Sequence, residues 1–271
     1  METISNSVII VCLLTAFIYT IKTLAVSTRI VAARTKKIGS SNSIFNMISI
    51  FGNLAMAFQM PLLAKTVEKN IANGVATDTF VFRIVILSAT FGAILGVVLI
   101  PSMQRILIVW VESLYKHQNI FEVLLESIKK GSVKGFYRKL AFPKIQNLLR
   151  LREYHDIPLI FIILTTIVYS FTTVSVLASL YAGCLNPSLR VTALSLNGIS
   201  MGLGTFSQML FLQPHNATMT DRMLNGSISE SYLRKYFTFV VLAQILGTIL
   251  GQILFVPLAN CVVFIADIIK V

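Results

Sequence analysis

Cationic and amide side chains stand close together near the start of a chain that is otherwise strongly apolar. Lys22, Arg29 and Lys36 recur every seven residues, so a helical period places them on one face as a stripe of positive charge. Asn46 and Asn53 repeat the same spacing shortly afterwards. Polar and charged groups are costly at membrane depth, and where they occur they mark substrate paths. The stretch therefore predicts a path for an anionic or polar-headed substrate.

The candidate path residues share a cationic or amide side chain within or beside an apolar run. They are Lys22, Arg29, Arg34, Lys36, Asn46, Asn53, Gln59, Asn197 and Gln208. Simpler roles stay open for each. A lysine at the membrane edge can extend its amine to the headgroups, and arginines can anchor the cytosolic end of a span. Amides can hold helices together through hydrogen bonds worth about 1 kcal/mol each.

The composition is that of an integral membrane protein. Of the 271 residues, 55% are hydrophobic and only 13% are charged, whereas soluble domains carry about 25% charged residues. Several uncharged windows of about 20 residues are long enough to cross roughly 30 Å of hydrocarbon as helices. A membrane barrel would alternate apolar and polar positions, which these runs do not do. We therefore expect an all-α, polytopic membrane protein.

The apolar runs predict six transmembrane helices in two groups of three. The predicted spans are residues 7–27, 42–64, 80–111, 157–183, 189–212 and 236–269. Residues 1–111 then form a first half and residues 157–271 a second half. Between them, residues 112–156 form a basic linker with apolar residues at helical spacing. This pattern predicts short amphipathic helices on the cytosolic membrane surface, with a docking site for another protein as the alternative.

The basic residues decide the predicted orientation in the plasma membrane. If the loop after the first span is cytosolic, most of the 23 lysines and arginines fall on the cytosolic side, as the positive-inside rule requires. Both chain termini are then outside. This topology accounts for the formal net charge of +12, so we expect membrane lipids and not nucleic acid as partners.

Two segments of the first half resemble two segments of the second. FGAILGVVLIP at residues 91–101 and LGTILGQILFVP at residues 246–257 share two glycines, the triplet ILG and a proline. FNMIS at residues 45–49 matches LNGIS at residues 196–200 at a similar offset. Because three spans are an odd number, the second copy would enter the membrane in the opposite direction. The pattern predicts a 3+3 inverted repeat, with the substrate path at the interface between the halves.

Motifs for catalysis and for metal binding are absent from the sequence. The three histidines are scattered and the three cysteines lack the spacing of metal ligands. There is no glycine-rich phosphate loop and no nucleophile elbow. The predicted spans also carry almost no acidic residue, which disfavours a proton relay. We expect a protein that is not an enzyme and uses no cofactor or metal.

Residues 27–63, with the sequence STRIVAARTKKIGSSNSIFNMISIFGNLAMAFQMPLL, resemble the bacterial family of alternate lipid II flippases called Amj. The chain length and the layout of six spans are similar to those of the family as well. The resemblance implies that the chain moves undecaprenyl-pyrophosphate-linked peptidoglycan precursor, lipid II, from the inner to the outer leaflet of the plasma membrane during cell-wall biogenesis. It supplies no set of binding residues.

Two other functions stay open. The chain could flip or export another isoprenoid-linked or anionic lipid. It could also be a non-transporting scaffold that recruits cell-wall enzymes through its basic linker. The cations near the inner leaflet suit a pyrophosphate, and the amides and hydroxyls of the spans suit sugar and peptide. Association with further copies of the chain or with cell-wall synthesis proteins is left open in each case.

Overall fold

The computed structural model of the chain describes residues 6–72, 79–119, 122 and 158–269. All regular structure in these ranges is helical, and they contain no strand. The helices are α1 (Asn6–Ala25), α2 (Ser27–Thr35), α3 (Ile38–Ala72), α4 (Thr79–His117), α8 (Leu159–Leu185), the short 3₁₀ helix η2 (Pro187–Leu189), α9 (Arg190–Ser207), the π-helical turn η3 (Gln208–Leu212), α10 (Gln213–Leu224) and α11 (Glu230–Ile268). Most of the basic linker lies outside the described residues, so its amphipathic helices stay a prediction.

Five helical segments in the described ranges are long and apolar enough to cross a membrane. They are Asn6–Thr35, Ile38–Lys69, Thr79–His117, Leu159–Leu185 and Glu230–Ile268. The prediction of an all-α, polytopic membrane protein is confirmed. The predicted span 189–212 is helical and continues through η3 into α10, but it is not among these five. A total of six crossings therefore stays a prediction.

The chain reverses direction at short polar turns. Lys36 ends α2 in a left-handed conformation with φ 57°. Asn186 and Pro187 end α8 and lead through η2 into α9. At the start of α11 the hydroxyl of Ser229 accepts a hydrogen bond of 3.2 Å from the backbone N–H of Tyr232, which satisfies one of the N–H groups that a helix start leaves free.

Two glycines of α4 bring this helix close to α1. A Cβ atom at Gly92 would lie 2.1 Å from the carbonyl oxygen of Ala16, and one at Gly96 would lie 2.6 Å from Cβ of Thr23. The hydroxyl of Thr20 also donates a hydrogen bond of 2.9 Å to the carbonyl of Gly92. Backbone contact through small residues is a main source of helix association in lipid. The two glycines, four residues apart and so about one helical turn from each other, thus let the backbone of α4 come close to α1.

The two matching glycines of α11 pack in the same way against α8. A Cβ atom at Gly247 would lie 2.7 Å from the carbonyl oxygen of Thr166, and one at Gly251 would lie 2.9 Å from Cγ1 of Val174. In each half, therefore, the last long helix uses its glycine pair to pack against the first helix of the same half. The remaining long helix of each half, α3 in the first and α9 in the second, also packs against the first helix of its half, α1 or α8.

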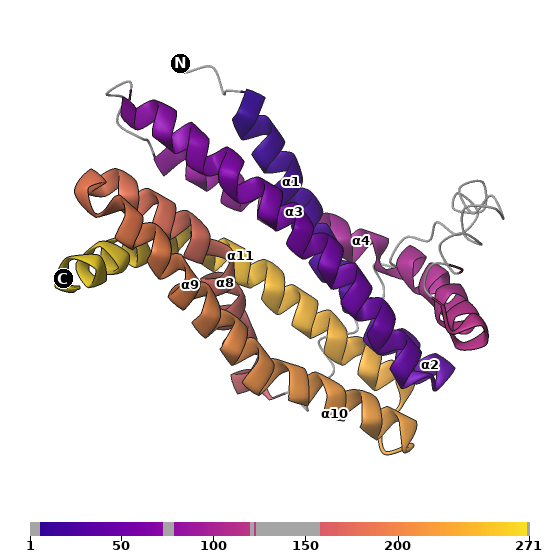
Figure 1. The fold of residues 1–271 in the computed structure, drawn as a ribbon. Coiled ribbons are helices and arrows are strands. Elements are labelled where there is room, and N and C mark those ends of the chain that lie inside the picture. Colours follow the sequence, from indigo (N-terminus) through magenta and orange to yellow (C-terminus); the bar gives the residue numbers. More distant parts are fainter. Residues whose placement is uncertain (1–5, 73–78, 120–121, 123–157, 270–271) are drawn as a thin grey trace.

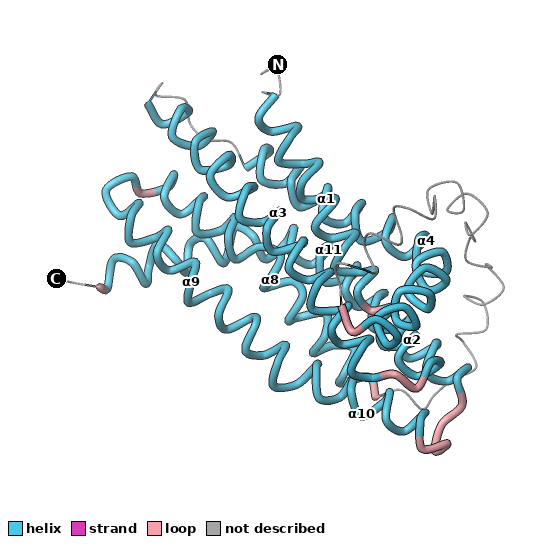
Figure 2. The backbone as a smooth tube through the Cα atoms, turned by 45° about the vertical axis from the view of Figure 1, so that its right-hand side comes forward, coloured by secondary structure: helices cyan, strands magenta, loops and turns pink. Residues whose placement is uncertain are grey.

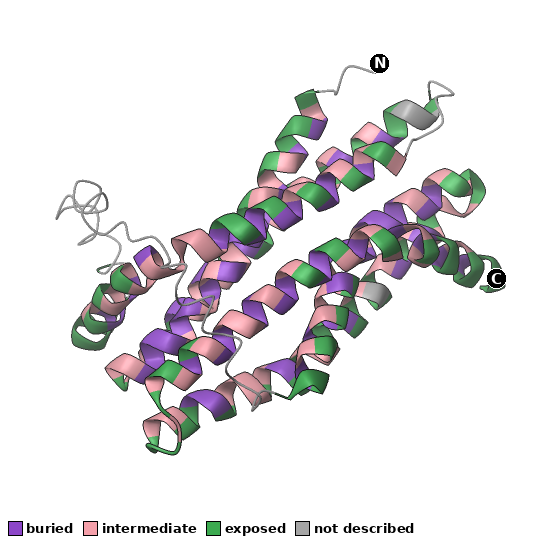
Figure 3. Ribbon diagram, turned by 180° about the vertical axis from the view of Figure 1, so that it is seen from behind, coloured by how far each residue is buried: buried purple, intermediate pink, exposed green. Residues whose placement is uncertain are grey.

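Corresponding helices of the two halves run in opposite directions. Figure 1 shows α1, α4 and α9 running toward the end of the bundle that carries α2 and α10, and α3, α8 and α11 running away from it. Figure 2 shows both chain ends at the opposite end of the bundle. We call these the α2–α10 end and the termini end. Figure 3 shows buried positions between the helices and exposed positions over their outer faces.

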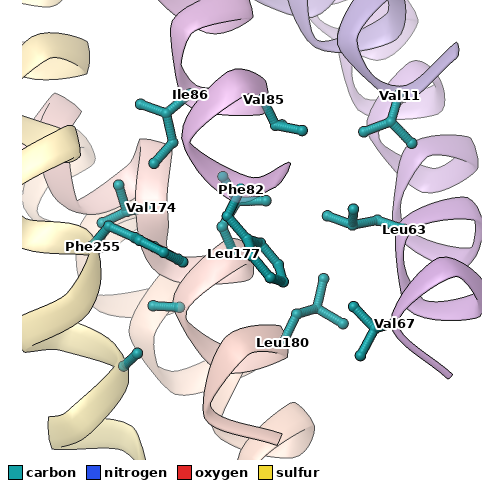
Figure 4. Close-up of a cluster of buried hydrophobic side chains, with 12 residues drawn as sticks. Val11, Leu63, Val67, Phe82, Val85, Ile86, Val174, Leu177, Leu180 and Phe255 are labelled. Atoms are coloured by element: carbon teal, nitrogen blue, oxygen red, sulfur yellow. The ribbon is translucent and has the colours of Figure 1, made fainter. Parts of the chain in front are cut away.

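An apolar cluster fills the space between the halves at the termini end. Phe82 of α4 stacks on Phe255 of α11 with ring centroids 5.4 Å apart, and Tyr181 of α8 lies 5.5 Å from Phe82. Val11 of α1 and Leu63 of α3 complete the cluster from the first half (Figure 4). Every one of these side chains except that of Tyr181 is almost fully buried. The halves are thus packed together at this end.

Candidate functional site

A cavity of about 300 Å³ lies between the halves on the α2–α10 side of the bundle. Polar groups from five segments reach its wall: Lys22 of α1, Arg29 of α2, Asn53 of α3, Tyr169 of α8 and Gln208 of η3. Four of these were predicted from the sequence as path residues, and Tyr169 was not. The cavity therefore combines an amine, a guanidinium and two amides next to apolar side chains.

Lys22 supplies a positive charge without a carboxylate beside it. Its side chain is partly buried in the wall of the cavity, and its Nζ lies 5.1 Å from the centroid of the Tyr19 ring. No ion pair involving Lys22 occurs among the described residues. An isolated charge at membrane depth is costly. An anion that binds beside Lys22 would reduce this cost, so Lys22 would bind it more tightly than an amine exposed to water would.

Arg29 is held in the wall of the cavity by neutral partners. Its Nη2 donates to Oε1 of Gln213 at 2.9 Å, and its Nη1 donates to Oδ1 of Asn42 at 3.3 Å. Its guanidinium carbon lies 5.5 Å from the centroid of the Phe45 ring. The negative charge of Asp221 acts on it from α10 without forming an ion pair. A guanidinium has five N–H donors, so donors remain for a phosphate.

The π-helical turn η3 directs two glutamines toward the cavity. Gln208 and Gln213, five residues apart, both line it. Pro214 follows Gln213 directly. A proline inside a helix has no N–H group to donate, and its ring clashes with the carbonyl four residues earlier. For Pro214 this is the carbonyl of Leu210, inside η3. The wider turn relieves this clash, and such turns are frequent at functional sites. Pro214 was the signal in the sequence that would have pointed to Gln213.

Two tyrosines, the buried Tyr19 and the partly buried Tyr169, line the cavity from corresponding places of the two halves. Tyr19 comes from α1 and interacts with Thr173 through its hydroxyl, and Tyr169 comes from α8 and interacts with Gln208. The sequence reasoning missed Tyr19, because a single tyrosine in an apolar run is an ordinary core residue. The match between the two halves would have identified the pair.

Further polar lining residues were also missed. They are Thr205, Gln213 and Asn216. Oδ1 of Asn216 accepts a hydrogen bond of 2.7 Å from the hydroxyl of Tyr236. Next to Asn216, the imidazole of His215 stacks on Phe161 with centroids 4.2 Å apart. Burial lowers the pKa of His215, and the positive charge of Arg222 lowers it further, so this imidazole is neutral near pH 7 and adds no charge to the cavity.

Arg34 and Lys36 lie at the α2–α10 end outside the cavity. Nε of Arg34 is 2.7 Å from Oε1 of Glu230 on α11, and its Nη1 donates to Oε1 of Gln104 on α4 at 3.1 Å. Glu230 also pairs with Arg234 on its own helix. Lys36 is exposed beyond the end of α2. The predicted cationic stripe therefore continues only from Lys22 to Arg29, because the helix is interrupted after Ala25 and ends before Lys36.

The three remaining predicted residues do not line the cavity. Asn46 is exposed on α3. Gln59 donates from Nε2 to the hydroxyl of Thr15 at 2.7 Å and lines a separate, small cavity of about 30 Å³. Asn197 of α9 is partly buried, and its Oδ1 has no hydrogen-bond partner among the described residues.

The cavity opens sideways between α3 and α9. Asn53 of α3 and Thr205 of α9 both line the cavity and are also exposed at the surface of the bundle. α3 packs on α1 and α9 packs on α8, and Figure 1 shows the two helices apart from each other. Exposed apolar side chains stand beside the opening, among them Leu54 and Phe206. Lipid tails pack on exposed apolar surfaces of membrane helices, so we expect this opening to meet the bilayer.

The comparisons with known proteins agree with the resemblance found in residues 27–63. A family model described as Amj, alternate to MurJ, matches residues 14–266. The chain belongs to the Amj family. It is 28% identical over 260 residues to a protein named lipid II flippase Amj from Bacillus subtilis (strain 168), and the match covers 95% of this chain and 96% of that relative. No solved structure matches the chain.

The described residues contain no group of three His, Cys, Asp or Glu side chains that could hold a metal ion.

Proposed function

We propose that this Amj-family chain flips lipid II from the inner to the outer leaflet of the bacterial plasma membrane. The observation that carries the proposal is a cavity whose wall contains two cations and exposed residues of both α3 and α9. The relative from Bacillus subtilis is named for lipid II flipping. In this proposal the chain moves the lipid without making or breaking a covalent bond.

The chemistry of the cavity fits the junction between lipid tail and sugar. Lys22 and Arg29 bind the pyrophosphate, since amine and guanidinium donors form strong, charge-assisted hydrogen bonds with phosphate oxygens. Asn53, Gln208 and the Tyr169 hydroxyl supply hydrogen bonds to the adjacent sugar. The polyprenyl tail leaves through the opening between α3 and α9 and remains in the bilayer.

The size of the cavity limits how much of the substrate it encloses in this conformation. A volume of about 300 Å³ is at the lower end of the range for small-molecule sites, about 300–1,000 Å³. It suits the pyrophosphate and one sugar ring better than the whole headgroup. The remainder of the headgroup then stays at the α2–α10 end until the protein changes conformation.

Alternating access between two inverted halves completes the proposal. The halves are residues 1–111 and 157–271. The equivalent glycine packing of α4 on α1 and of α11 on α8, with opposite helix directions, supports this division. The α2–α10 end is cytosolic and both termini are outside, since the basic residues Arg29, Arg34 and Arg234 gather at that end. Rocking the halves would close the cavity on the cytosolic side and part the apolar cluster at the other.

A related cargo is the second candidate. Lys22 and Arg29 would serve any polyprenyl-pyrophosphate-linked sugar, because the groups they contact are shared. A competition experiment distinguishes lipid II from such a related cargo. If lipid II is the preferred substrate, an excess of unlabelled lipid II should slow the flipping of labelled lipid II more than the same excess of a different polyprenyl-pyrophosphate sugar does. Assembly with further copies of the chain or with cell-wall synthesis proteins stays a prediction.

The experiment that tests the proposal is a leaflet assay in proteoliposomes. The purified protein is reconstituted with fluorescent lipid II, and a membrane-impermeant quencher measures how much remains protected with time. We expect the protected fraction to fall faster with the protein than without it, and we expect no such effect on fluorescent phosphatidylglycerol. Equal rates with and without the protein would contradict the proposal.

A further inference from the structure

The side chain of Gln244 is buried in α11 without a hydrogen-bond partner. It is 0% exposed, and within the part of the chain that the structure describes neither its Oε1 nor its Nε2 is paired. A buried polar group left unpaired costs about 1–3 kcal/mol, and an amide carries both a donor and an acceptor. Gln244 therefore destabilises the conformation described here.

The other glutamines within described helices all have partners. They are Gln59, which pairs with Thr15; Gln104, which pairs with Arg34; Gln208, which pairs with Tyr169; Gln213, which pairs with Arg29; and Gln252, which pairs with the carbonyl of Arg83. These five side chains are only partly buried, whereas that of Gln244 is fully buried. Among the glutamines of the described helices, the position of Gln244 is thus the one where the amide oxygen and nitrogen are both buried and unpaired.

That position is directly behind the wall of the cavity. Val240, one helical turn earlier on the same face of α11, lines the cavity. Gly247, three residues later, lies against α8, where its Cβ position is 2.7 Å from Cβ of Tyr169, another lining residue. Along α11, Phe255 of the apolar cluster follows about three turns after Gln244. Gln244 therefore lies between the cavity and the closed end.

We propose that Gln244 binds the polar headgroup of the lipid in a second conformation, in which the cavity extends along α11 toward the termini end. An amide that both donates and accepts suits sugar hydroxyls and peptide groups, which do the same. The unpaired amide is stabilised once the headgroup reaches it. This inference rests on the proposed function, because it requires a lipid-linked headgroup that passes from one end of the bundle to the other.

Replacement by leucine separates a binding role from a structural one. Gln244→Leu keeps a similar volume and removes the unpaired amide, so we expect a melting temperature equal to or above that of the wild type. We expect the rate of lipid II flipping to fall by about three- to tenfold, as for the loss of one or two neutral hydrogen bonds in the transport step. Gln252→Leu is the matched control on the same helix, and it should lower the melting temperature because it removes a paired amide.

Thiol labelling gives a second readout. In a variant with Cys12, Cys184 and Cys261 replaced by alanine, Gln244→Cys should react with a membrane-impermeant thiol reagent during lipid II turnover and much more slowly without lipid II. Ala266→Cys, also buried on α11 but in a separate apolar cluster with Ala182 and Ala193 of the same half, should react no faster with lipid II present.

Three results would overturn the inference. These are wild-type flipping by Gln244→Leu, a fall in its melting temperature that accounts for the lost flipping, or the same labelling of Gln244→Cys with and without lipid II. Failure of the wild-type protein to flip lipid II would instead contradict the proposed function itself.

Discussion

The two ends of the helical bundle differ in what fills the space between the halves. At the termini end, Phe82, Phe255 and Tyr181 pack ring against ring with their apolar neighbours. Beside this cluster, hydrogen bonds between Arg83 and Gln252 and an ion pair between Arg190 and Glu68 also join the halves. At the α2–α10 end, the space is a cavity whose wall carries Lys22 and Arg29. The difference indicates a conformation that is closed at one end and accessible at the other, with the charge at the end where we propose that the substrate enters.

The largest expected effect comes from neutralising the charged end. The double variant Lys22→Gln with Arg29→Gln removes two charge-assisted interactions with the pyrophosphate. We expect lipid II flipping in proteoliposomes to fall by about 100-fold. Lys36→Gln, an exposed cation outside the cavity, is the control and should flip at the wild-type rate. Similar rates for the double variant and this control would show that the cations only anchor the helix.

The next largest effect is a loss of stability when the apolar cluster at the termini end is disrupted. Phe255→Ala removes a fully buried ring from the apolar cluster, and we expect the free energy of unfolding to fall by about 3–5 kcal/mol. The measurement is denaturant unfolding in detergent micelles. Phe58→Ala, at a ring that is 69% exposed on the lipid-facing surface, should change it by less than about 1 kcal/mol. Equal losses would mean that the cluster does not hold the halves together.

Glycine substitutions test whether the two halves pack alike. Gly92→Ala and Gly247→Ala each place a methyl group against backbone of the neighbouring helix, and we expect each to lower the free energy of unfolding by about 1–3 kcal/mol. Gly202→Ala on α9, where nothing lies within 4 Å of the added atom, should be neutral or slightly stabilising. A large loss in one half and none in the other would break the correspondence between them.

The smallest expected effect is at the rim of the accessible end. Glu230→Gln weakens the link between Arg34 of α2 and α11, in which both side chains are partly exposed, at 24% and 35%. Exposed ion pairs contribute about 0–1 kcal/mol, so we expect a change in flipping rate of less than about fivefold. A loss as large as that of the double cation variant would place the substrate-binding charge at Arg34 instead of in the cavity.

Much of this architecture follows from patterns that the sequence displays directly. Uncharged apolar runs predicted the long helices, and the glycines shared by residues 91–101 and 246–257 predicted that the two halves correspond. Lys22, Arg29, Asn53 and Gln208 were also predicted, because a polar group in an apolar run stands out.

The rest of the site depends on packing that spacing alone does not determine. Asn46 has the same seven-residue relation to Asn53 that Lys22 has to Arg29, yet it lies exposed outside the cavity. Tyr19 and Gln213 line the cavity because of how α1 and α10 are placed. The pairing state of Gln244 is likewise a property of the whole bundle, since it depends on which side chains of other helices come within reach.

The most direct test of lipid entry between α3 and α9 is photocrosslinking of radiolabelled lipid II in native membranes. A photoreactive side chain at Thr205, beside the opening, should crosslink lipid II, and an excess of unlabelled lipid II should suppress the product. The same side chain at Ile249, a 48% exposed position on α11, should give little product. Equal crosslinking at the two positions, or none at Thr205, would contradict the account.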